Sequence, residues 1–155
     1  MKIRKAKKED ISKIVAIHKK CVLETNAKLY SSSAIKEWVN QISAENVKEQ
    51  FKNSSWYVLS VKNRIMGFTQ FSLDDGELYQ ININSNFQDK GYGKILYNFV
   101  ENQFVKNKVK EISLNSTLNA FEFYKGLGFK SLGEIKIKLD KSSIKMIKMR
   151  KAIKS

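Results

Sequence analysis

The order of apolar and polar positions predicts a mainly helical first third of the chain. A short strand over 1–5 precedes apolar residues that recur at three- and four-residue spacing up to about Glu24, which is typical of an amphipathic helix. Ser31–Ser33 and Ser43 are suited to begin two further short helices, the second of which runs to Phe51. We therefore expect one strand followed by three helices in this part of the chain.

The middle of the chain predicts three consecutive strands, at 55–61, 65–73 and 77–84. Lys62-Asn63 and Asp74-Asp75-Gly76 provide the turns between them. In the third strand, the alternation places Tyr79, Ile81 and Ile83 on one face.

The last part of the chain alternates again between helices and strands. Helical periodicity returns over Tyr92–Phe104, and a strand at 111–115, a helix at 119–127 and strands near 130–139 and 144–150 follow. This order predicts an α/β (α+β) protein with a mixed, mostly antiparallel central sheet of about seven strands and helices on both faces. Because the chain has no proline and no Gly/Ser-rich linker, we expect a single domain over 1–155.

Composition excludes several classes of site. A single cysteine, Cys21, cannot form an internal disulfide, and a single histidine, His18, excludes a two-histidine metal site. No run approaches 18 apolar residues, and the first residues have no apolar stretch like that of a signal peptide. We expect a cytoplasmic protein with no metal and no membrane contact.

The net charge of +14 raises the question of nucleic-acid binding. Residues 1–20 carry a net charge of +6 and residues 130–155 carry +7, so the middle of the chain is nearly neutral. Lysine supplies 26 of the 29 basic residues, whereas bidentate phosphate and base contacts favour arginine. This favours lysines that keep the protein soluble, with an RNA-linked substrate as the alternative.

The segment Gln88–Lys94 lies between a predicted strand and a predicted helix and has the composition of a phosphate site. Gly91 and Gly93 allow the backbone to approach a ligand closely. The following helix offers unpaired N–H groups and the positive end of its dipole, an arrangement that binds pyrophosphate. The segment lacks the third glycine of a dinucleotide fingerprint and the G-K-[ST] of a Walker A loop.

This segment resembles the signature of the GCN5-related N-acetyltransferase (GNAT) family, [Gln/Arg]-x-x-Gly-x-[Gly/Ala], which Gln88, Gly91 and Gly93 fill. Downstream, the segment from Asn119 through Tyr124 to Phe129 is similar to the family's segment in which an asparagine is followed by a tyrosine and then by Gly-Phe. The resemblance extends over the whole chain, and its specific part covers residues 77–129.

The resemblance implies a GNAT fold and the use of acetyl-CoA. The strand corresponding to Leu78–Ile83 would separate from its neighbour, and main-chain groups of Ile81 and Ile83 would hold the pantetheine arm. Asn119 would contact the same arm, and Tyr124 would lie near the thioester sulfur. The pyrophosphate would bind to the loop formed by Gln88, Asp89, Lys90, Gly91, Tyr92, Gly93 and Lys94.

Acetyl transfer to an amine needs a base, because an alkyl ammonium has a pKa near ~10.4. Glu77, at the start of the central strand, is the candidate base, acting directly or through water. Tyr124 is the candidate acid that protonates the leaving thiolate. Together these residues predict direct transfer from acetyl-CoA to a primary amine of a small molecule, protein or peptide.

Several alternatives stay open at this point. Cys21 belongs either to the core or, with His18 one helical turn away, to an acyl-cysteine route. Trp38, Trp56, Phe68 and Phe71 are either core or acceptor-pocket residues. The other functions considered are acetylation of an aminoacyl-tRNA amine, a nucleic-acid-binding module and a CoA sensor without turnover, and the chain is expected to be a monomer or a homodimer.

Overall fold

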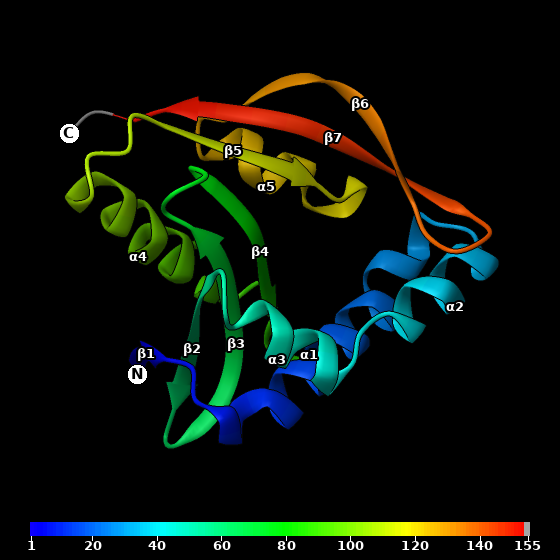
Figure 1. Ribbon diagram of the computed structural model, residues 1–155, viewed down its shortest axis with the longest axis horizontal. Helices are drawn as coiled ribbons and strands as arrows, with labels where there is room; N and C mark the ends of the chain where they lie inside the picture. Colours follow the sequence, from blue (N-terminus) through cyan, green and yellow to red (C-terminus); the bar gives the residue numbers. More distant parts are fainter. Residues whose placement is uncertain (154–155) are drawn as a thin grey trace.

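A seven-stranded sheet forms the centre of the computed structural model, which describes residues 1–153 (Figure 1). The sheet order is β1-β2-β3-β4-β5-β7-β6, and every neighbouring pair is antiparallel except β4–β5. The strands are β1 (Lys2–Lys5), β2 (Ser55–Val61), β3 (Arg64–Ser72), β4 (Glu77–Ile83), β5 (Glu111–Ser116), β6 (Lys130–Lys138) and β7 (Ser143–Ala152). The predicted fold class is confirmed.

Helices cover both faces of this sheet. They are α1 (Ile11–Glu24), α2 (Ser32–Asn40), α3 (Ala44–Gln50), α4 (Tyr92–Lys106) and α5 (Phe121–Gly126), with 3-10 turns η1 (Lys8–Asp10), η2 (Asn26–Lys28), η3 (Ser85–Phe87) and η4 (Leu118–Ala120). Ser31 and Ser43 accept hydrogen bonds from the backbone N–H groups of Ala34 and Asn46, as their N-cap role requires.

The core consists of clusters on the two faces of the sheet. On the α1 face, Trp56 and Phe68 pack with the apolar side of the helix, including Cys21. On the α4 face, Phe71 packs with Tyr97 and other helix residues. Burying a large apolar side chain of this kind stabilises the fold by about 1.5–3 kcal/mol. Trp56, Phe68 and Phe71 are therefore core residues.

Strand β4 departs from regular alternation. Phe71 of β3 pairs with Leu78, and Gln70 pairs with Gln80, so Tyr79 has no partner and forms a β-bulge. As a result Leu78, rather than Tyr79, joins Ile81 in the core cluster under α4, and Tyr79 is exposed. The expectation that Tyr79 shares the face of Ile81 and Ile83 is wrong for this reason.

Strands β4 and β5 pair at one position only, between Glu77 and Ser113. Beyond this pair the two strands diverge, and in Figure 1 β5 and β7 cross the top of the molecule while β2, β3 and β4 run nearly upright. The sheet therefore opens between β4 and β5.

One strand from each basic end of the sequence forms an edge of the sheet. β1 forms one edge and β6, paired to β7, forms the other. Exposed lysines along an edge strand discourage pairing with another chain, and Lys136 and Lys138 of β6 are exposed in this way. Within residues 1–153, no helix combines the length and the apolar character needed to cross a bilayer.

Candidate functional site

A cleft of about 690 Å³ follows the opening between β4 and β5. Asn84 donates its backbone N–H to the carbonyl of Met66 on β3. Because main-chain groups alternate in direction along a strand, those of Ile81 and Ile83 point away from β3 and toward the opening. Both residues line the cleft, so β4 presents an unpaired strand edge to it.

One end of the cleft is closed by the loop that leads into α4. Gly91 has φ of +85° and is the N-cap of this 15-residue helix, and Asp89 also has a positive φ. The first backbone N–H groups of a helix lack intrahelical partners, so those at the start of α4 can bind an anion. A Cβ at Gly93 would lie 3.5 Å from the Phe123 ring, an ordinary van der Waals distance, so α5 packs next to the first turn of α4.

The charged and polar side chains of this loop differ in whether they line the cleft. Asp89 and Lys94 line the cleft, but Lys90 does not. The amide of Gln88 donates to the carbonyl of Ile83 at 3.1 Å, and its oxygen lies 3.4 Å from the Thr25 hydroxyl. Gln88 therefore ties the loop to the end of β4 and to the segment after α1.

Tyr124 lies on the opposite wall, on α5. Its ring is buried and packs edge-on against Phe123 and Phe129. Burial raises the pKa of its hydroxyl, so the group stays protonated at neutral pH. Asn119, just before α5, is exposed and also lines the cleft.

Glu77 lies where β4 and β5 still pair, at the closed end of the opening. Its side chain is half-buried and is not among those that line the cleft. Partial burial raises its pKa, the charge of Asp75 raises it further, and Lys148 lowers it. The Glu77 carboxylate therefore lies outside the lining of the cleft.

His18 and Cys21 both line the cleft from α1. Burial lowers the pKa of His18 to about 4, so its imidazole is uncharged at neutral pH. Burial raises the pKa of Cys21 to about 11, and its thiol donates to the carbonyl of Ile83 at 3.0 Å. The thiolate that an acyl-cysteine route needs is therefore disfavoured.

A chain of side-chain amides lies on the α1 side of β4. Asn82 donates to Gln80 at 2.7 Å, Gln80 to Gln70 at 2.8 Å, and Gln70 to Gln50 at 3.1 Å. Gln70, Gln80 and Asn82 all line the cleft. Sequence reasoning missed these residues, although polar residues at alternate positions of a central strand were a signal for them.

The structure thus brings together most of the predicted positions. All but one of the expected cofactor-binding residues line the cleft, namely Ile81, Ile83, Gln88, Asp89, Gly91, Tyr92, Gly93, Lys94, Asn119 and Tyr124. Lys90 and the expected base Glu77 do not line it. Trp38 has both expected positions, because it packs partly buried against the core cluster of Val22, Ile35 and Ile42 and also lines the cleft. Among residues 1–153, no three His, Cys, Asp or Glu side chains gather where they could hold a metal ion.

Comparison with known families gives one clear match. The family model described as an acetyltransferase (GNAT) domain matches residues 26–153, which include the whole cleft loop, β4 and α5. A search of curated proteins finds no match to this chain.

Solved structures share the fold at low sequence identity. A GCN5-related N-acetyltransferase from Rhodopseudomonas palustris superposes with a TM-score of 0.91 at 14% identity, covering 98% of this chain and 95% of that one. PaiA N-acetyltransferase from Thermoplasma acidophilum, solved with coenzyme A, gives 0.76 at 22% identity and 98% coverage of both chains. A phosphinothricin acetyltransferase from Sinorhizobium meliloti, solved with acetyl-CoA, gives 0.75 at 15% identity, covering 98% of this chain and 88% of that one.

Proposed function

This chain belongs to the GNAT acetyltransferase family, and we propose that it transfers the acetyl group of acetyl-CoA directly to a primary amine of a small molecule, protein or peptide. The observation that carries the proposal is the opening between β4 and β5, which pair only at the start of β4, while the N-terminus of α4 follows the other end of that strand. The similar structures solved with coenzyme A and acetyl-CoA support the choice of donor. The continuous sheet supports treating the whole chain, 1–155, as one acetyltransferase domain.

Two parts of the cleft are suited to hold the donor. The backbone N–H groups at the start of α4, with the cation of Lys94, would bind the pyrophosphate. The unpaired main-chain groups of Ile81 would hydrogen-bond the amides of the pantetheine arm, as an added strand does. The carbonyl of Ile83 already accepts from Cys21 and Gln88, so Ile81 is the stronger candidate for this contact.

Tyr124 is the proposed group at the leaving sulfur. In the reaction the amine nitrogen bonds to the acetyl carbon and the carbon–sulfur bond breaks, so negative charge develops on sulfur. A thiol has a pKa near ~8.5, below that of an ordinary phenol. Because burial raises the pKa of Tyr124 further, its main contribution would be a hydrogen bond to the developing thiolate.

Glu77 is the proposed final acceptor of the ammonium proton, reached through water because its side chain does not line the cleft. Leu78 packs under α4, so the pleat of β4 turns Glu77 to the opposite face, which it shares with Gln80 and Asn82. The uncharged amides of these two residues line the cleft, where they could contact an acceptor.

The charges of the residues that line the cleft limit the kinds of acceptor that it could bind. Of the lining residues, Asp89 carries the only carboxylate, and it belongs to the loop before α4. An acceptor with several ammonium groups would find few partners among the amides of Gln70, Gln80 and Asn82. We therefore favour an acceptor whose reactive amine is its main positive charge.

The test is an acetyl-transfer assay with acetyl-CoA and a panel of amines, which follows release of the free thiol. The panel contains amino acids, N-terminal peptides, polyamines and aminoacyl-tRNA. We expect turnover with a singly charged amine and none with polyamines. If no amine releases thiol above the rate of hydrolysis while acetyl-CoA still binds, the transfer reaction is wrong and a CoA sensor is the better reading.

The alternative, an amine carried on RNA as the acceptor, is tested in the same assay by changing the salt concentration. Contacts to phosphates weaken steeply with salt, by about 10³–10⁵ in affinity between 50 and 200 mM for 6–10 contacts. The edge strands that belong to the two basic ends, β1 and β6, lie at opposite edges of the sheet, so their cations do not form one shared surface for RNA. We expect added tRNA to leave turnover of a small amine unchanged at either salt concentration.

A further inference from the structure

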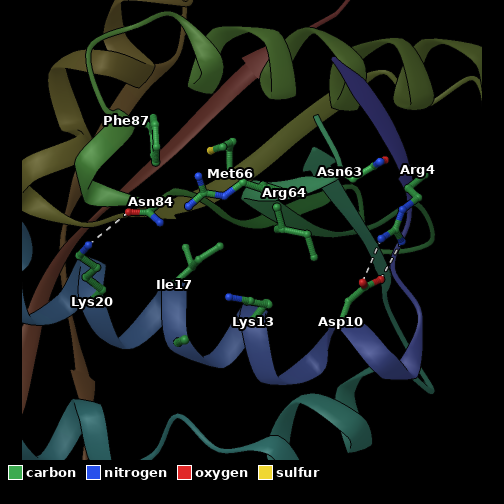
Figure 2. Close-up of a pocket in the computed structure, with 12 residues that line it drawn as sticks. Arg4, Asp10, Lys13, Ile17, Lys20, Asn63, Arg64, Met66, Asn84 and Phe87 are labelled. Carbon is green, nitrogen blue, oxygen red and sulfur yellow. Dashed lines mark hydrogen bonds and ion pairs between the residues drawn. The ribbon is translucent and has the colours of Figure 1, made fainter. Parts of the chain in front are cut away.

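A second cavity, of about 330 Å³, lies between α1 and the turn that joins β2 to β3 (Figure 2). Lys13, Ile17 and Lys20 line it from α1, and Arg64 and Met66 line it from the start of β3. Asn84 and Phe87, from the turn after β4, close one end. None of the catalytic or donor-binding roles proposed above uses this cavity.

The cavity is strongly cationic. Lys13, Lys20 and Arg64 form no ion pair with any residue between 1 and 153. The one carboxylate in the lining belongs to Asp10, and Arg4 neutralises it through two hydrogen bonds, of 2.7 and 3.0 Å. Figure 2 shows these bonds at one end of the cavity, apart from the other three cations. The lining therefore has a net charge of +3.

The cations surround the cavity rather than lying on one flat surface. In Figure 2, Lys13 and Lys20 extend from α1 on one side and Arg64 from β3 on the other. The two lysines are seven residues apart, which is two helical turns or about 10 Å along the helix axis. Lys20 is held toward the turn after β4, with its ammonium 3.5 Å from the Asn84 side-chain oxygen.

The cavity is separate from the cleft but adjacent to it. Phe87 is the one residue that lines both, so its ring forms the common wall. An anion bound among Lys13, Lys20 and Arg64 would therefore lie on the other side of Phe87 from the loop that begins at Gln88.

We propose that this cavity is a binding site for a small phosphomonoester. A phosphomonoester has a charge of about −1.5 to −2 at neutral pH, which three cations can neutralise. The guanidinium of Arg64 can bind two phosphate oxygens at once, and the lysines act as point charges. The volume is at the lower end of small-molecule sites, about 300–1,000 Å³. Ile17, Met66 and Phe87 provide apolar surface for a short carbon body.

The test uses the full chain without acetyl-CoA and phenyl phosphate as the probe, at about 50 mM salt, where charge interactions are weakly screened. Two-dimensional amide NMR reports where the probe binds. We expect saturable changes in the amide chemical shifts of residues 13–20 and 63–66 rather than of residues 88–94. Inorganic phosphate and benzoate are compared with it, because the first lacks the ring and the second replaces the phosphate by a carboxylate.

Lys13→Gln/Arg64→Gln is the test variant, because both side chains are exposed and neither forms an ion pair in the described range. Lys136→Gln/Lys138→Gln on β6 is the matched control, with the same loss of charge far from the cavity. We expect the affinity for phenyl phosphate to fall about tenfold or more in the test variant, because it loses two of the three cations and their charge-assisted hydrogen bonds to the phosphate. The control should bind as the wild type does.

Three results would overturn the proposal. The first is probe shifts centred on 88–94, which would place the phosphate at the loop before α4. The second is equal affinity in the wild type and in Lys13→Gln/Arg64→Gln, or no saturable binding at millimolar probe. The third is benzoate binding as tightly as phenyl phosphate, which would mean a site for anions in general. None of these readouts depends on acetyl transfer.

Discussion

Replacing Gly91 by aspartate tests whether the loop before α4 binds the donor's pyrophosphate. A Cβ at this position has no atom within 4 Å, so the fold has room for the side chain. The cost to folding is conformational, because the φ of +85° disfavours an L-residue by about 1–2 kcal/mol. For a chain of this size such a loss lowers the melting temperature by about 2–8 °C.

The cost to binding comes from charge. Two unit charges 4 Å apart repel by about 1 kcal/mol in water and by about 4 kcal/mol at an effective dielectric constant of 20. These energies correspond to a rise in the Kd for acetyl-CoA of about 5-fold to about 1,000-fold. Because the pyrophosphate has more than one charge and the helix N-terminus is partly enclosed, we expect a value near the upper end.

Gly133→Asp provides the matched control. Gly133 also has a positive φ, +111°, and open space around its Cβ, but it lies on the edge strand β6. Isothermal titration calorimetry should show wild-type binding for this variant and weakened binding for Gly91→Asp. At about 100 times Kd, acetyl-CoA should stabilise the wild type and Gly133→Asp by roughly 2.7 kcal/mol. If Gly91→Asp binds within threefold of the wild type, or if both variants lose binding equally, the loop is only a turn.

Three further substitutions test the remaining parts of the cleft. Tyr124→Phe should slow single-turnover acetyl transfer by about 10²-fold, the low end for a positioned proton donor. The Kd for acetyl-CoA should not change. A wild-type transfer rate in this variant would mean that Tyr124 takes no part in the chemistry. Cys21→Ala should leave the transfer rate within about twofold and show no acyl-enzyme by mass spectrometry, because a thiol with a pKa of about 11 is a poor nucleophile. His18 has a pKa of about 4 in the folded chain and about 6.5 when unfolded. The wild type should therefore lose stability as the pH falls from 6.5 to 4, and denaturation curves of His18→Gln should show a flatter dependence across that window.

The elements were predictable because short-range patterns determine them. The strand at Ser55–Val61 has the bounds that its β-branched and aromatic run predicts, and Ser31 and Ser43 cap the helices that follow them. In each case the deciding interaction joins residues that are close in sequence, or the side chains alternate between the two faces of a strand. The fold class followed from the order of these elements.

The bulge at Tyr79 could not be predicted in the same way. Leu78 and Tyr79 are both apolar, so alternation alone does not decide which of them faces the core. The pairing of β4 with β3 decides it, because Gln70 and Phe71 are matched to Gln80 and Leu78 with one residue left over. A register of this kind depends on contacts between strands, and a single sequence does not state them.

The cavity beside α1 was out of reach for a similar reason. The spacing of Lys13 and Lys20 places both on one side of a helix, which by itself describes an ordinary solvated surface. The cavity exists because Arg64, more than forty residues away, is brought opposite them by the β2–β3 turn. The pairing of Asp10 with Arg4, which leaves the other cations without a carboxylate, is likewise a tertiary contact.

Net charge is where the topology most changes the interpretation of the sequence. The excess lysines are grouped at the two ends of the chain, and in the sequence these ends look like two parts of one basic surface. The sheet order places the cations of β1 at one edge and those of β6 at the other, so these two sets are separated by the full width of the sheet. On edge strands their repulsion acts against strand pairing between molecules. Lys13 and Lys20 also belong to the basic first part of the sequence, but they lie on α1, and the fold places them with Arg64 around a single cavity.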